Sequence, residues 1–199
     1  MTDQLSLSLW LDRHAQPARL RHFLKLLRLF PFSQREQPQS TLAIRGIAST
    51  EPPLLERPLN GPFNLAELEP IFNEYKGDDI AYELDSWWDL WQFHDDWELR
   101  PSHVAIACFG PAFDNGTERA RGEQEDLRIE FGVDTQFVPD LNVPGSARLI
   151  ESNIKSLLHL VHEVDSAIPV RERRLETETG ENFAERLQQT LTAASSRPS

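Results

Sequence analysis

The chain has 199 residues, of which 39% are hydrophobic, and this is enough to bury one substantial core. Its formal net charge is −12. Proteins that bind nucleic acid need a concentrated basic surface to displace counterions from the phosphates, so this charge argues against that class. We expect a single α+β domain over residues 1–194, followed by a disordered tail at 195–199, which reads SSRPS.

The single cysteine and the first residues of the chain both favour the cytoplasm. Cys108 stands in the apolar run VAIACFG and has no second cysteine with which to form a disulfide. We therefore expect a buried thiol in a reducing compartment. The N-terminus carries Asp3 in place of the cationic stretch of a secretion signal, and no apolar run approaches membrane-spanning length.

The first two predicted elements are a strand and a helix. Residues 5–11 read LSLSLWL, and their strict alternation of leucine with other residues is typical of a half-buried strand. Pro17 fits the first turn of a helix whose apolar residues recur at helical spacing until Pro31. Its opposite side is basic, so the helix either packs on a sheet or lies on a membrane, and packing on a sheet is favoured. The basic residues are Arg21, Lys25 and Arg28.

Two strands and a second helix are expected next. Residues 41–49 predict a strand, and flanking prolines confine 54–57 to a short edge strand. Asn64 and Glu67 have the spacing of a capping box at the start of a helix. Pro70 is expected to kink or split that helix.

Alternating and helical patterns continue to the end of the chain. Strands are predicted at 80–93, 103–109 and 127–133, a long helix at 147–168, and a last helix from the capping box at Asn182. The expected core face of the long helix comprises Ile150, Ile154, Leu157, Leu158, Val161 and Val164. The patterns predict one antiparallel or mixed sheet of about five or six strands with helices mainly on one face. The first half has the β-α-β-β-α-β order of a ferredoxin-like unit.

One segment is both strongly acidic and rich in tryptophan. Residues 78–98 contain four of the five tryptophans among eight acids. The wider segment 51–98 holds thirteen acids and two bases, a net charge of −11, whereas residues 1–45 hold seven bases and three acids, a net charge of +4. A plain solvated face is the commoner reason for such clustering, and a recognition surface is the other.

A strand over 80–93 would divide these residues between two faces. One face, with Ile80, Tyr82, Leu84, Trp88 and Leu90, is the predicted core face. The other alternates carboxylates with indoles, and an exposed indole beside a carboxylate suits a guanidinium or ammonium group. The predicted partner-binding residues are those of this second face, Glu83, Asp85, Trp87, Asp89 and Trp91. As an alternative, the basic helix covers this face and its cations pair with the acids.

An enzyme is the other class of function that the segment allows. Imidazole and carboxylate oxygen suit a divalent metal, so Asp85, Asp89, His94, Asp95 and Asp96 could serve a metal-dependent hydrolase. A polar turn between strands explains residues 92–97 better. Nucleophile elbows, phosphate-binding loops and CxxC pairs are missing from the sequence. We therefore expect a protein that is not an enzyme and that binds no metal or cofactor.

In composition alone, the chain resembles immunity proteins, which are compact acidic proteins that cover the active sites of basic toxins. This resemblance implies an inhibitor-like protein that binds a basic protein partner in the cytoplasm. The net charge and the lack of a long apolar run predict no contact with nucleic acid or membrane.

Overall fold

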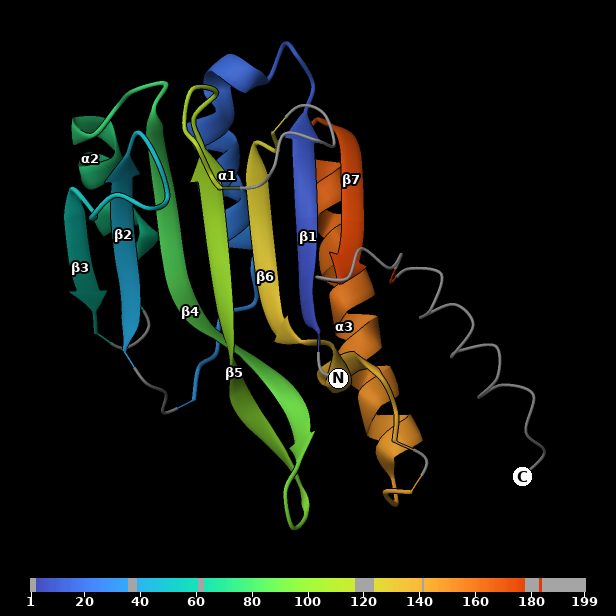
Figure 1. The fold of residues 1–199 in the computed structure, drawn as a ribbon. Coiled ribbons are helices and arrows are strands. Elements are labelled where there is room, and N and C mark those ends of the chain that lie inside the picture. Colours follow the sequence, from blue (N-terminus) through green and yellow to red (C-terminus); the bar gives the residue numbers. More distant parts are fainter. Residues whose placement is uncertain are drawn as a thin grey trace.

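The computed structural model describes residues 3–35, 39–60, 63–116, 124–140, 142–177 and 183. These residues form an α+β fold around one open sheet of seven strands (Figure 1). The sheet order is β3-β2-β4-β5-β6-β1-β7, and every pair of neighbouring strands is antiparallel. The strands are β1 (Gln4–Leu11), β2 (Ser40–Gly46), β3 (Leu55–Leu59), β4 (Ile80–Phe93), β5 (Trp97–Phe109), β6 (Leu127–Val133) and β7 (Val170–Thr177).

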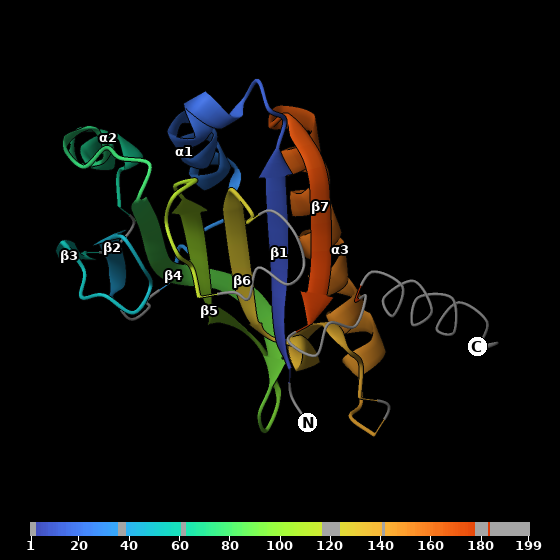
Figure 2. The same cartoon turned by 45° about the horizontal axis from the view of Figure 1, so that its top comes forward.

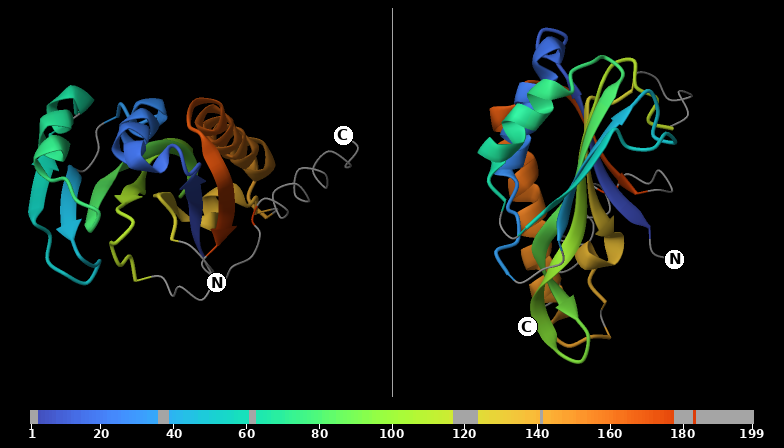
Figure 3. Two further views of the ribbon diagram at one scale, coloured as in Figure 1. Left: turned by 90° about the horizontal axis from the view of Figure 1, so that it is seen from above. Right: turned by 90° about the vertical axis from the view of Figure 1, so that its left-hand side faces the viewer.

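Three α-helices cover one face of the sheet. They are α1 (Arg19–Leu29), α2 (Leu65–Glu74) and α3 (Ser146–Ala167). Figures 2 and 3 show α2 near the β3 end of the sheet, α3 along the β7 end and α1 between them. The other face of the sheet, toward the viewer in Figure 1, is called the front face below. No helix in the described part of the chain has both the length and the apolar character needed to cross a membrane.

The core lies between the sheet and the helices. The leucines at 5, 7, 9 and 11 of β1 are fully buried there, as their alternation predicts. From the helical side α1 contributes Phe23, Leu26 and Leu27. Trp88 of β4 is 3% exposed, and its ring lies 5.7 to 6.3 Å from those of Phe30, Phe131 and Phe137. Packing of these aromatic rings joins the centre of the sheet to the segments that cover it on the helical side.

Two predictions about the sheet are corrected. It has seven strands where five or six were expected, because β7 was not predicted. The sequence of β7, VRERRLET, lacks apolar alternation, since among the described residues the strand lies at the edge of the sheet and pairs with β1 alone. The chain does run β-α-β-β-α-β at its start, but no ferredoxin-like unit forms. Strands β5 and β6 separate β1 from β4, and no neighbouring strands are parallel.

Helices α2 and α3 also differ in detail from the sequence patterns. Helix α2 begins at the predicted cap, where the Asn64 side chain accepts a hydrogen bond from Ala66, but it continues through Pro70 without being split. In α3, Leu158 is 43% exposed and not part of the core, whereas Leu160 and Asn153 are buried. The predicted helix from Asn182 and the tail at 195–199 lie outside the described residues, apart from Phe183.

Trp88 provides a test of the core. Trp88→Ala is expected to lower the free energy of unfolding by about 3 to 5 kcal/mol, because it leaves a cavity among three aromatic rings. Chemical denaturation measures this change. Trp87→Ala is the matched control, since the neighbouring side chain is on the other face and is only half-buried. Equal losses in the two variants would contradict the assignment of faces.

Candidate interaction surface

Five side chains of β4 lie in line on the front face of the sheet. Burial alternates along the strand, so that Tyr82, Leu84, Trp88 and Leu90 face the helices. The intervening residues are partly exposed, and we call them the acidic tryptophan strip: Glu83, Asp85, Trp87, Asp89 and Trp91. The structure therefore places all five predicted partner-binding residues on one face.

Small neighbours leave room around the carboxylates of the strip. Glu83 lies between Ala43 of β2 and Ala107 of β5. Asp85 lies opposite Ala105, and its side chain is 49% exposed, more than that of Glu83 or Asp89. Residues directly opposite in an antiparallel pair point to the same side of the sheet. Methyl groups beside Glu83 and Asp85 thus keep these carboxylates accessible from the front.

The most exposed carboxylate of the strip faces a histidine. His103 Nε2 lies 3.2 Å from Asp85 Oδ1, and the His103 ring packs against that of Trp87 with the centroids 5.4 Å apart. The hydrogen bond to Asp85 raises the pKa of His103 above its ordinary value, and the charges of Asp85 and Glu130 add to the effect while burial opposes it. Asp85, Trp87 and His103 thus form one cluster across β4 and β5. No partner for His103 could be predicted from the sequence.

The other two carboxylates also have partners within the chain. Glu83 pairs with Arg45 at 2.9 Å. Asp89 accepts a hydrogen bond of 2.6 Å from Ser33, and Arg35 Nε lies 3.9 Å from its other oxygen. These contacts come from β2 and from the segment after α1, where the backbone N–H of Ser33 donates to the Trp87 carbonyl. The strip therefore carries less net charge than its three acids alone would give.

Helix α1 does not cover the strip, so the alternative in which its cations pair with these acids is wrong. The helix packs on the opposite face of the sheet (Figure 3). Lys25 donates to the carbonyl of Ala167 at the end of α3, and Arg28 forms an ion pair with Glu69 of α2. Lys25 and Arg28 therefore make contacts with the other two helices.

The backbone of Trp91 forms two hydrogen bonds with a buried asparagine of α3. Asn153 is 2% exposed, accepts from the Trp91 N–H and donates to the Trp91 carbonyl, each at 2.9 Å. The same amide nitrogen donates to the carbonyl of Gln136. Buried asparagine is uncommon unless its amide is satisfied, and here it joins α3 to the backbone of β4. A polar residue on the apolar side of the predicted helix was the signal that could have revealed this contact.

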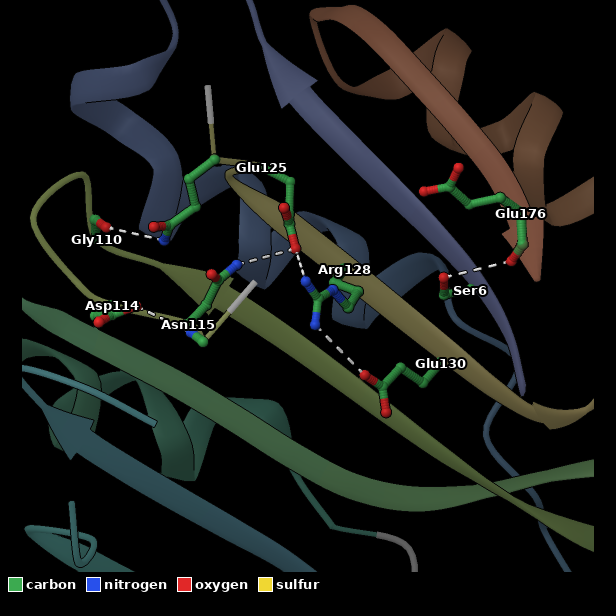
Figure 4. A network of polar contacts seen from close by, with 10 residues as sticks. Ser6, Gly110, Asp114, Asn115, Glu125, Arg128, Glu130 and Glu176 are labelled. Atoms are coloured by element: carbon green, nitrogen blue, oxygen red, sulfur yellow. Dashed lines mark hydrogen bonds and ion pairs between the residues drawn. The ribbon is translucent and has the colours of Figure 1, made fainter. Parts of the chain in front are cut away.

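A second polar network lies toward the β6 side of the front face (Figure 4). Arg128 pairs with Glu125 and, at 3.6 Å, with Glu130, and its guanidinium carbon lies 5.3 Å from the centre of the Phe109 ring. Asn115 donates to Glu125 at 3.2 Å. The Glu125 side chain is only 7% exposed. Because Arg128 offsets one of the two glutamate charges, this region offers a partner less unpaired charge than its acids alone would give.

The structure does not assemble the proposed metal ligands. Asp85 faces His103 and Asp89 faces Ser33, whereas His94, Asp95 and Asp96 lie in the turn between β4 and β5. Within the described ranges, no three His, Cys, Asp or Glu side chains are grouped so that they could hold a metal ion.

Comparison of the chain with protein-family models, with curated proteins and with solved structures finds no match.

The His103 cluster predicts a pH dependence. A raised pKa in the folded state means that the pair with Asp85 stabilises the fold fully below the unfolded value of about 6.5. This stabilisation is lost as the pH rises through the folded pKa of His103. We expect NMR titration to place that pKa above 6.5 and Asp85→Asn to lower it. A His103 pKa that Asp85→Asn leaves unchanged would contradict the pairing.

Asn153 supports a prediction about the backbone of the strip. Asn153→Ala is expected to lower the free energy of unfolding by about 1 to 3 kcal/mol, since it leaves buried backbone groups of Trp91 and Gln136 without their partner. Ser156→Ala, on the exposed side of the same helix, should change it by less than about 0.5 kcal/mol. Denaturant titration distinguishes the two. Equal effects would show that the asparagine contributes no more than an exposed side chain.

Proposed function

We propose that this chain is a non-enzymatic binding protein that engages a basic protein partner through the acidic tryptophan strip. The immunity or inhibitor type of protein is the form of this function that we favour. The partner would present arginine or lysine side chains to the carboxylates and the indole faces. We further propose that the protein acts in the cytoplasm.

A single observation carries the proposal. Three carboxylates and two indoles project in line from one central strand, on the face opposite the helices. Tryptophan supplies a large contact area with little loss of side-chain entropy, and it is enriched among the residues that dominate binding energy. Strand β4 pairs with β5 along the whole strip and with β2 as far as Asp85, which supports preorganisation and so lowers the entropic cost of binding.

A partner must compete with the ion pairs that the strip already forms within the chain. A basic side chain that approaches Glu83 competes with Arg45, and one that approaches Asp89 competes with Arg35. Asp85 is the most accessible of the three, and its internal partner His103 is charged only when protonated. Asp85 is therefore the preferred site for a partner cation, which would contact both its carboxylate and the ring of Trp87.

The chemistry of the single cysteine argues against catalysis by a nucleophilic thiol. Cys108 is 1% exposed, and burial raises the pKa of its thiol to about 12. A nucleophilic cysteine needs a thiolate that substrates can reach. A buried neutral thiol fits a structural role in a reducing compartment.

The proposal predicts that charge and aromatic contact act on different rate constants. After capture of a partner from the native host, surface plasmon resonance at low and high salt measures both rates. Asp85→Asn with Asp89→Asn should chiefly slow association and weaken its salt dependence. Trp87→Ala or Trp91→Ala should chiefly speed dissociation. Where the residue is a hot spot, the loss of binding free energy should be about 2 kcal/mol or more.

A matched control removes the same charge elsewhere. Glu151→Gln with Glu163→Gln takes two negative charges from α3, on the other side of the sheet, and should leave both rates nearly unchanged. The proposal fails if the strip variants do not alter binding. It also fails if the control slows association as much, because the effect would then reflect net charge alone.

A further inference from the structure

The loop between β2 and β3 exposes two large apolar side chains. Of all large hydrophobic residues in the described ranges, Ile47 at 66% and Leu54 at 56% are the most exposed. They stand at the two ends of this loop, and Leu54 packs over Gly46, directly before Ile47. Single exposed apolar residues are ordinary, so exposure alone does not mark a site.

The backbone at Ile47 provides an independent observation. Ile47 has a φ of 71°, and no other non-glycine residue of the described chain has a positive φ. The N–H of Ala48 donates to the carbonyl of Gly46 at 2.8 Å, which makes Ile47 the centre of a three-residue γ-turn. This form of γ-turn is rare and strained, and a β-branched residue is among the least suited to positive φ.

Neighbouring segments hold this conformation in place. The N–H of Ile47 donates to the Asp79 carbonyl at 2.7 Å, and its carbonyl accepts from the N–H of Asp114 at 2.8 Å. Ser49 adds a backbone bond to the Asp114 carbonyl. Glycine or asparagine would take the same φ at lower cost, and the isoleucine, which is 66% exposed, gains little burial in return. Neither the turn nor the core therefore explains why an isoleucine is presented to solvent here.

The surroundings of the loop define the chemistry of an occupant. Residues 46–54, 77–80 and 110–116, which these hydrogen bonds join, contain four acids, and the bases Arg45 and Lys76 directly precede two of these ranges. The acids are Glu51, Asp78, Asp79 and Asp114, of which Asp78 pairs with Arg19. An exposed apolar group with an acidic border complements an apolar pocket with a basic border.

Arg45 connects this loop to the acidic tryptophan strip. Its Nε lies 2.9 Å from Glu83 of the strip, and its Nη1 donates to the carbonyl of Glu51 in the loop at 2.8 Å. In the right-hand view of Figure 3, the β2–β3 loop and the loop after β5 lie together on the side of the sheet away from the helices. The strip and the loop are thus parts of one continuous surface.

We propose that the β2–β3 loop is a second anchor of the interface, and that Ile47 and Leu54 insert into an apolar pocket bordered by basic residues on the same basic partner protein. This inference rests on the proposed function and extends it. The strained turn holds Ile47 outward before the partner arrives, so that little entropy is lost when the side chain enters the pocket.

The test uses the purified full chain and a phage-displayed library of random cyclic peptides as the probe. We expect the selected peptides to combine lysine or arginine with apolar residues. Ile47→Asn should weaken their binding roughly tenfold or more, as for the loss of an interface anchor. Its free energy of unfolding should be equal to or higher than that of the parent, because asparagine tolerates positive φ. Leu158→Ala, at an exposed leucine of α3, is the control and should bind the peptides as the parent does.

Each contrary result has a distinct meaning. The inference is overturned if no peptide is selected, or if the selected peptides bind Ile47→Asn as tightly as the parent. It is also overturned if Ile47→Asn is less stable than the parent, since Ile47 would then serve the fold. Peptides that lose affinity for Trp87→Ala and not for Ile47→Asn would support the strip and reject the loop. The reverse pattern would reject the strip and retain the loop.

Discussion

The pairing of β4 with β5 is the constraint on which the rest of the structure depends. The two strands keep one register from Ala81 opposite Phe109 to Phe93 opposite Trp97. They also occupy the middle of the sheet, where β2 and β6 add to their outer edges. Because side chains alternate between faces, a slip of one residue would send Trp88 to the front and bury Trp87 and Asp89. The same register thus determines both the core and the acidic tryptophan strip.

Internal pairing limits the field that the front face can produce. Glu83 and Asp89 have arginines nearby, and Arg128 lies between two glutamates. A net charge of −12 therefore overstates the attraction that a partner would meet at this surface. Recognition would depend on groups whose partners are weak or conditional. Asp85, beside a titratable histidine, and the half-buried indoles are the main examples.

The faces of β4 could be predicted from the sequence, and the partners of its side chains could not. Period-two alternation places Trp88 in the core without reference to any other strand. By contrast, the contact between Asp85 and His103 requires the register of the hairpin. A turn centred on Asp95 pairs Phe93 with Trp97 and, counted back equally along both strands, Trp87 with His103.

Other features had no local signal. Strand β7 is formed by residues that alternate poorly, since the sheet supports it from one side only. The strained turn at Ile47 arises from hydrogen bonds to Asp79 and Asp114, which are distant in sequence. Strand order is likewise a property of long-range contacts. Leu158 lies next to the buried Leu157 on α3, and its apolar side chain alone does not show that it faces solvent.

The position of β1 has a consequence for how the chain folds. This strand pairs only with β6 and β7, more than 115 residues further along the chain, as its register with β6 shows. Closing so long a loop costs conformational entropy before any contact offsets it, and topologies with many such contacts fold slowly. The hairpin of β4 and β5 closes a short turn and can form early. We therefore expect β1 to join the sheet late in folding. Until β6 and β7 are in place, its leucines stay exposed to solvent and can pair incorrectly.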